Sequence, residues 1–259
     1  MSDYQEQIIA DYQKLIYDIY QKEKLTSLKG LNNEFLVNGR NIVEWHAVIT
    51  RKGRCKYYKS FDFIQNFDDL VLCSDEIMYF IANMYLYRPY MNSPIDDGLP
   101  FAGKMLYPNY ENLPAYRYSM FADVVSQKLY NYWDRIGDLI AAYFPDLLKP
   151  HQVYFPKIID VIPVQYHNEY YFWLREFRDF DYKIINQSRK EIVHYNTIGT
   201  KFKHDHLQNS RNYKKIKSLT DDRYELVDFF KKQLHISITG FEKTVLFVET
   251  ITKLSLNGV

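Results

Sequence analysis

The placement of proline constrains this 259-residue chain more than any other feature of its sequence. All nine prolines lie between Pro89 and Pro163, five of them within 89–114 and four within 145–163. Proline breaks the interior of a helix because it lacks a backbone N–H and clashes with the preceding turn. Long helices are therefore allowed before, between and after these two segments, which we predict to be irregular connections.

Apolar residues in the proline-free regions recur with the spacing of amphipathic helices. The predicted helices cover 3–25, 65–88, 118–144, 168–198 and 221–255. Gly199 suits the position just after the fourth helix, and Asp221 or Asp222 suits the N-cap of the fifth. Residues 40–60 are less regular, and their partial alternation is compatible with a small β-hairpin.

Composition and motifs exclude several classes of protein. Hydrophobic residues make up 47% and charged residues 25%, which is ordinary for a globular chain and unlike a disordered one. The two cysteines, Cys55 and Cys73, form no CxxC pair, so a reduced, cytoplasmic location is expected. The sequence has no visible signal peptide, no apolar run long enough to span a membrane and no glycine-rich phosphate loop.

Positive charge is concentrated in one segment, although the net charge of the chain is only +1. Residues 183–217 carry nine lysines and arginines against two acids, Glu191 and Asp205. Such a segment indicates a surface for an anion or a nucleic acid, with a solvated basic helix and loop as the alternative. The 25 tyrosines fit base stacking and an aromatic core equally well, so their number decides nothing.

Arg189 and His194 are the candidate catalytic residues of this basic segment. Five helical positions separate their side chains by about 140° around the axis, so both could border one groove. Histidine transfers protons near neutral pH, and arginine holds a phosphate and stabilises its charge. The pair suits metal-independent RNA cleavage by the 2′-hydroxyl, and Glu191 could orient the His194 ring. The alternative is a helix with a surface arginine and a half-buried histidine.

This pattern resembles the R-x4-6-H signature of the HEPN superfamily, the higher eukaryote and prokaryote nucleotide-binding domains. The matching segment runs from Arg189 through Lys190 to His194, and 123–144 is similar to the preceding helix, with Asp134 as its polar residue. The resemblance covers roughly 115–255. It implies a mostly α fold: a HEPN-like antiparallel helical bundle over 115–259, with a helical extension over 1–114 that has room for one small β-hairpin.

The resemblance also implies a function and partners. It implies a metal-independent endoribonuclease of toxin–antitoxin or antiviral systems, acting as a homodimer on RNA and controlled by an antitoxin-type protein. Active members often carry asparagine or another small polar residue after the arginine, whereas this chain has Lys190, which could contact phosphate instead. The alternative is a catalytically silent HEPN domain that binds nucleotide, RNA or a protein partner.

The remaining basic residues complete the predicted site. We expect Lys201, Lys203, His204 and Arg211 to contact RNA, and we expect no cofactor. His204-Asp205-His206 could ligate a metal ion, but no third ligand lies nearby in the sequence and the surroundings are basic. We therefore predict a solvated loop there, without a metal.

Overall fold

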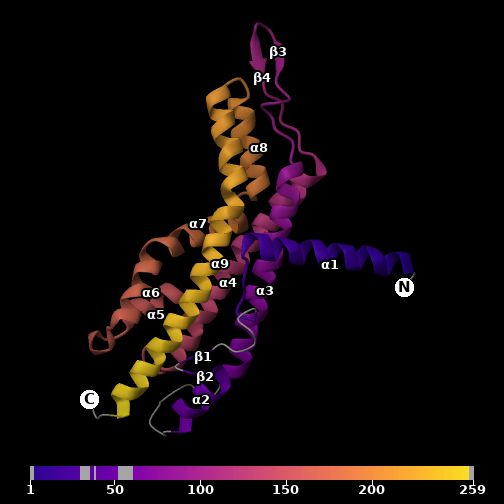
Figure 1. Ribbon diagram of the computed structural model, residues 1–259. Helices are drawn as coiled ribbons and strands as arrows, with labels where there is room; N and C mark the ends of the chain where they lie inside the picture. Colours follow the sequence, from indigo (N-terminus) through magenta and orange to yellow (C-terminus); the bar gives the residue numbers. More distant parts are fainter. Residues whose placement is uncertain (1–2, 30–35, 38, 52–60, 257–259) are drawn as a thin grey trace. The chain divides into compact units, whose positions relative to one another are not determined.

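The computed structural model describes residues 3–29, 36–37, 39–51 and 61–256, and within them the fold is mostly α, as predicted (Figure 1). The α-helices are α1 Asp3–Glu23, α2 Ile42–Arg51, α3 Phe63–Tyr87, α4 Leu113–Ala142, α5 Phe155–Val161, α6 Glu169–Asp179, α7 Asp181–His194, α8 Ile198–Asn209 and α9 Tyr213–Leu256. Short 3₁₀ turns lie at η1 Arg88–Tyr90, η2 Pro150–Gln152 and η3 Val164–Tyr166.

Two antiparallel hairpins accompany the helices. One pairs β1 (Leu36–Val37) with β2 (Arg40–Asn41), and the other pairs β3 (Leu99–Phe101) with β4 (Lys104–Leu106). The second hairpin lies inside the proline-rich connection 89–114, which is therefore partly ordered.

The hairpin expected within 40–60 is wrong over its first half, because 42–51 form α2 rather than a strand. The Asn41 side chain accepts a hydrogen bond from the Glu44 backbone N–H and so begins the helix. Ile42, Trp45 and Ile49 are buried, at the spacing of one helical stripe, and this outweighs the short alternation of the sequence. The second half of the expected hairpin, 52–60, lies outside the described residues.

The proline boundaries were predicted well, with two exceptions, the start of α4 and the connection 145–163, in which Pro156 lies in the first turn of the short helix α5. α3 ends at Tyr87, directly before η1 and its Pro89. α4 begins earlier than expected, at Leu113, and includes Pro114, which is tolerated in a first turn where no intrahelical N–H bond is lost. The Asn112 side chain caps this turn by accepting a hydrogen bond from the Ala115 N–H.

The predicted helix 168–198 is in fact two helices. It is interrupted at Phe180, whose backbone (φ −117°, ψ −81°) leaves the helical region, and α7 then ends at His194. Gly199 does not terminate it but lies in α8, because Thr197 caps a new helix by accepting a hydrogen bond from the Thr200 N–H.

The last helix is longer than predicted. α9 begins at Tyr213, capped by Asn212, whose side chain accepts a hydrogen bond from the Lys215 N–H. Asp221 and Asp222 are therefore interior positions of α9, and their expected capping role is wrong. A 44-residue helix is stable without an internal cap because tertiary packing along its apolar face supplies most of its stability.

The chain packs into two compact units that interleave along the sequence. The first contains the described residues of 1–25, 77–127 and 188–233, and the second those of 26–76, 128–187 and 234–259. α3, α4, α7 and α9 each contribute a segment to both units. The division of the chain at residue 114 stays a prediction.

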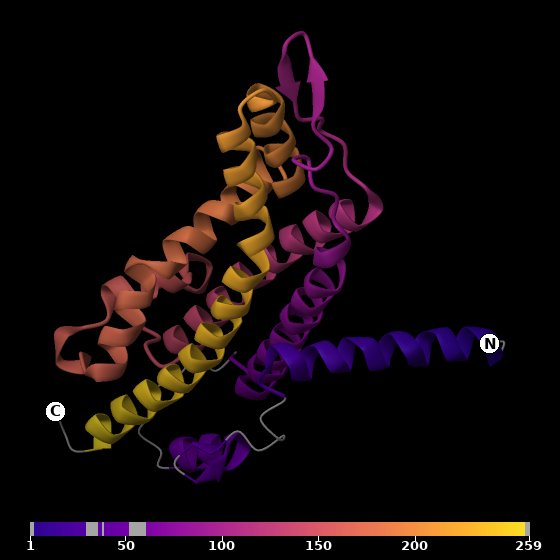
Figure 2. The ribbon, with the colours of Figure 1, turned by 45° about the horizontal axis from the view of Figure 1, so that its top comes forward.

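The first unit is built around the amino-terminal halves of α4 and α9. Figures 1 and 2 both show α8 lying beside the first turns of α9. Tyr118 of α4 is fully buried, and its hydroxyl donates to the Arg223 carbonyl and accepts from the Val227 N–H of α9. These bonds satisfy the buried phenol and fix the register of the two helices.

The second unit is centred on Trp133 of α4, which is fully buried. Its ring stacks on Phe177 of α6 at a centroid distance of 3.8 Å and lies 4.9 Å from the ring of Phe155 of α5. Gly240 of α9 also lies against this ring, and a Cβ atom there would lie only 2.2 Å from Cη2 of the indole. Glycine is therefore required at 240 for the helix to approach the tryptophan.

None of the described helices is both long and apolar enough to cross a membrane.

We predict that Gly240→Ala lowers the free energy of unfolding by about 1–3 kcal/mol, the usual cost of overpacking a core. The added methyl group would force the Trp133 ring out of its stack. Urea denaturation followed by tryptophan fluorescence measures the loss. Ser218→Ala, at an exposed position of the same helix, is the control and should change stability by less than about 0.5 kcal/mol. Equal stability of the two variants would contradict the packing described here.

Candidate functional site

Arg189 and His194 both lie in the last two turns of α7, within the first unit. His194 is the final residue of the helix and is exposed, and Arg189 is half-buried. The short arc between them, about 140° at 100° per residue, carries Lys190 and Val193, which are also exposed. Arg189 and His194 therefore lie at the two edges of the outward face of α7.

A pocket of about 230 Å³ lies on the opposite face of the same helix turns. Ser188, Glu191 and Ile192 line it, and on a helical wheel they form one continuous arc that excludes the motif residues. Arg189 and His194 are not among its lining residues. On a helical wheel Arg189 lies about 60° beyond Ile192, and His194 about 60° beyond Glu191. The two motif residues thus flank the pocket-facing stripe on its two sides.

α8 supplies a second wall through Ile198, Lys201 and Phe202. Lys201 forms an ion pair with Glu191, with its Nζ 2.6 Å from Oε2, and both side chains are partly exposed. Glu191 therefore engages Lys201, and its expected orientation of the His194 ring stays a prediction. The pair links the end of α7 to α8 across the pocket.

The other residues expected to contact RNA are spread over α8 and the turn after it. Lys203, His204 and Arg211 are all exposed and are not among the residues that line the pocket. On the helical wheel Lys203 and His204 lie on the face of α8 that points away from Ile198 and Phe202.

The segment 204–206 is helical, so the predicted loop is wrong. His206 is fully buried, and its Nε2 lies 2.9 Å from the Tyr107 carbonyl oxygen, while His204 is exposed. Two residues separate their side chains by about 200° around a helix, which prevents both from ligating one ion. Among the described residues no group of three or more His, Cys, Asp or Glu side chains is placed to hold a metal ion.

Asp134, the expected polar partner on α4, belongs to the second unit, whereas the motif belongs to the first. The charge of Asp134 acts on the pKa of Asp138, one turn further along α4. Burial, and then the negative charge of Asp134, raise the pKa of Asp138 to about 6, and Arg135 partly opposes this. Asp138 lines a small pocket of the second unit together with Asp62 and Asp69.

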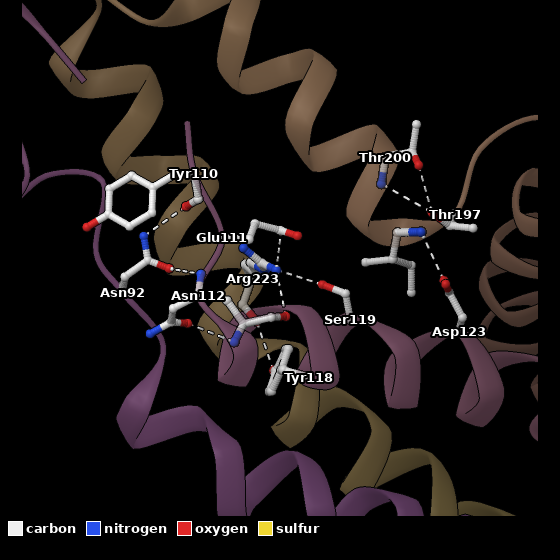
Figure 3. A network of polar contacts seen from close by, with 12 residues as sticks. Asn92, Tyr110, Glu111, Asn112, Tyr118, Ser119, Asp123, Thr197, Thr200 and Arg223 are labelled. Atoms are coloured by element: carbon white, nitrogen blue, oxygen red, sulfur yellow. Dashed lines mark hydrogen bonds and ion pairs between the residues drawn. The ribbon is translucent and has the colours of Figure 1, made fainter. Parts of the chain in front are cut away.

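Arg223 of α9 lines the pocket that α7 and α8 border. Figure 3 shows it in a network of polar contacts with Glu111 and Ser119. Only 9% of its side chain is exposed. One guanidinium nitrogen lies 2.6 Å from Oε1 of Glu111 and also donates to Ser119 Oγ and to the Ala115 carbonyl. Burial lowers the pKa of Arg223 and the Glu111 carboxylate opposes the shift, so the ion pair keeps the guanidinium charged.

Asp123 of α4 anchors the segment that follows the motif (Figure 3). Its Oδ1 accepts a 2.9 Å hydrogen bond from the backbone N–H of Ile198, the first residue of α8. Burial raises the pKa of this carboxyl group, and the hydrogen bond partly offsets the rise. A carboxylate at a helix N-terminus is favourable, so Asp123 fixes where α8 begins and hence where the chain turns after His194.

Sequence reasoning missed both Arg223 and Asp123. A signal for Arg223 was present, because it lies four residues before Val227 and seven before Phe230, on the buried stripe of α9. A charged residue on an apolar stripe indicates a buried pair. Asp123 carries no such signal, since its partner is a backbone N–H 75 residues away.

The helical architecture and the motif-bearing helix define an all-α domain, and a family comparison identifies its class. A HEPN family model matches residues 75–249, about two thirds of the chain, so the protein belongs to the HEPN superfamily. The matching family is described as Cthe2314-like HEPN. No curated protein and no solved structure matches the chain.

We predict that Arg223→Ala lowers the free energy of unfolding by about 3–5 kcal/mol, because the Glu111 carboxylate loses its buried partner. Chemical denaturation measures the loss. Arg117→Ala is the control. It removes an exposed arginine from the part of α4 that Arg223 contacts, and it should change stability by less than about 0.5 kcal/mol. If both variants lose the same amount, the Arg223 cluster is not the support that its geometry indicates.

We predict that Asp138→Asn stabilises the protein at pH 8 but not at pH 4. A folded pKa near 6, above the ordinary value of 3.8, means that ionisation of Asp138 opposes folding once the pH rises through this range. Since the residue is exposed to solvent, the gain should stay below about 1 kcal/mol. Melting temperatures at the two pH values measure this gain. Asp146→Asn is the control, because it also removes one exposed carboxylate. A gain at pH 4 equal to that at pH 8 would contradict the assignment.

Proposed function

We propose that this HEPN protein is a metal-independent endoribonuclease that uses Arg189 and His194. The observation that carries the proposal is the position of this pair at the solvent-exposed end of α7, where a phosphodiester can reach the His194 ring. Asp123 and Thr197 fix the chain just beyond, so His194 projects from a defined helix end.

The chemistry follows from the two side chains. The ribose 2′-oxygen attacks the adjacent phosphorus, the bond from phosphorus to the 5′-oxygen breaks, and a 2′,3′-cyclic phosphate forms. The 2′-hydroxyl loses one proton and the departing 5′-oxygen gains one, and His194 serves one of these transfers. The Arg189 guanidinium stabilises the added negative charge on the phosphoryl oxygens.

The surroundings favour an RNA backbone. Lys190 lies on the outward arc between the two motif residues, and exposed Lys203 and Arg211 follow on α8 and in the next turn. Exposed cations attract phosphates and release their counterions, which gives a salt-dependent affinity. Lys190 takes the place of the small polar residue common in active relatives, and we assign it a phosphate contact.

We further propose that two copies pair through the end of α7. Val193 and Tyr195 are 48% and 80% exposed, and both lie beside His194. A symmetric contact there would cover this apolar surface and bring the two His194 rings to one phosphodiester, one to accept a proton and one to give it. An antitoxin-type partner would compete for the same surface. Analytical ultracentrifugation of the full chain tests the dimer.

A silent binding domain is the second candidate, and one observation favours it. The pocket that α7, α8 and α9 border is not lined by Arg189 or His194, so the chain can bind a ligand there without chemistry at the motif. Retained RNA binding with no cleavage would support this function.

We predict that His194→Ala reduces RNA cleavage by a factor of about 10² or more, the scale of general acid–base catalysis. The fold should persist, because the side chain is exposed. Arg189→Ala should also slow turnover. It should reduce the slope of log affinity for RNA against log salt concentration by the amount that one phosphate contact contributes. Labelled RNA and chromatography of the 2′,3′-cyclic ends measure the reaction.

His151→Ala is the control for this prediction, since it removes an exposed histidine that is neither part of the motif nor among the residues expected to contact RNA. It should reduce cleavage far less than His194→Ala. Cleavage that EDTA abolishes and magnesium restores would refute the mechanism. Undiminished cleavage by His194→Ala would refute the site.

A further inference from the structure

The pocket bordered by α7, α8 and α9 contains a buried polar group that the protein leaves unsatisfied. Ser126 of α4 lines the pocket and is only 2% exposed, and its hydroxyl has no hydrogen-bond partner among the described residues. Burying a hydroxyl without a partner costs free energy. A ligand that offers a donor or an acceptor to Ser126 would remove this cost.

The other walls fit a flat ring. Phe202 of α8 and Phe229 and Phe230 of α9 line the same space, together with aliphatic side chains. The volume of about 230 Å³ is below the roughly 300–1,000 Å³ of sites for drug-sized ligands, so one ring system fits better than a larger molecule. Aromatic side chains hold nucleobases by stacking, with little regard to sequence.

The acids of the pocket disfavour a phosphate in its interior. Arg223 is the buried cation of the lining, and Glu111, Ser119 and the Ala115 carbonyl engage one nitrogen of its guanidinium, whereas its Nε–H has no hydrogen-bond partner among the described residues. Three acids, Glu191, Asp205 and Asp222, also line the space, and Glu191 is paired with Lys201. A neutral ring with amino groups suits these carboxylates, whereas a phosphate would meet their negative charge.

A phosphate would instead lie at the rim. Lys201, which pairs with Glu191, is 56% exposed by its side chain, and Asn196 lines the pocket just past the end of α7. His194 is two residues before Asn196 and about 60° from Glu191 around the helix. A nucleotide with its ring inside would therefore place its backbone on the side of the pocket nearest His194.

We propose that this pocket takes up one nucleobase of a single-stranded RNA and thereby positions the neighbouring phosphodiester at the motif. The inference rests on the proposed RNA substrate and names how that substrate is held. Ser126 supplies the hydrogen bond to the ring edge, Phe229 supplies stacking surface, and Lys201 receives the phosphate. The site thus reads an unpaired base and would reject a duplex, whose bases are stacked and paired.

The test titrates the full chain with the four ribonucleosides at millimolar concentration, using calorimetry. We expect at least one nucleoside to bind. Phe229→Ala should weaken its affinity by about 10- to 100-fold, the range of base stacking on an aromatic residue. Ser126→Ala should weaken it by about tenfold, the scale of one hydrogen bond, without destabilising the fold, because it removes an unsatisfied hydroxyl. Phe180→Ala removes an exposed phenylalanine outside the pocket and should leave the affinity unchanged.

The same variants are then assayed for cleavage of single-stranded RNA. If the inference holds, Ser126→Ala and Phe229→Ala raise KM in the order in which they weaken nucleoside binding, while His194→Ala lowers kcat. No nucleoside binding at millimolar concentration, or equal affinity of the parent and both pocket variants, would overturn the inference even if His194-dependent cleavage is intact. Pocket-dependent nucleoside binding without any cleavage would instead uphold the pocket and overturn the nuclease proposal.

Discussion

The buried guanidinium of Arg223 is the interaction on which the first unit depends. It projects from α9, bonds to the first turns of α4 through Ser119 and the Ala115 carbonyl, and pairs with Glu111 ahead of that helix. Its Cζ also lies 4.5 Å from the centre of the Phe202 ring of α8. Because a buried charge is tolerated only when it is paired and hydrogen-bonded, these elements have one arrangement rather than several. The pocket walls from α8 and α9 follow from that arrangement.

Much of the helical framework could be predicted because proline and hydrophobic period act locally. α1, α3 and α4 begin and end within a few residues of the expected positions, apart from the earlier start of α4. The breaks at Phe180 and after His194 were missed for a physical reason. A one-residue interruption barely shifts a 3.6-residue period, and the caps that restart the helices are single side chains such as Thr197. The apolar stripe therefore appeared continuous.

The candidate site was predictable only in part, and the difference lies in sequence distance. The helix that carries Arg189 and His194 was found because both residues share one short segment. The pocket behind it unites Ser126 with Phe230, residues 104 positions apart, and none of its lining residues forms a motif. The predicted role of Glu191 toward His194 relied on helical spacing alone, whereas the structure pairs Glu191 with Lys201, ten residues away in the sequence. The pocket depends on long-range packing, which no local pattern encodes.

If the proposed function holds, the geometry of α7 separates chemistry from recognition on one helix. Its outward arc, with Lys190 and Val193 between the motif residues, meets solvent, whereas Glu191 and Ile192 meet the pocket. Since side chains on opposite faces of a helix do not contact each other, substitutions on one arc can change activity while leaving the other intact. A single strand that places a base in the pocket would pass one of the two sides of α7, which bear Arg189 and His194, to reach the outward arc. Rate and base preference would then be set by different residues of the same two helical turns.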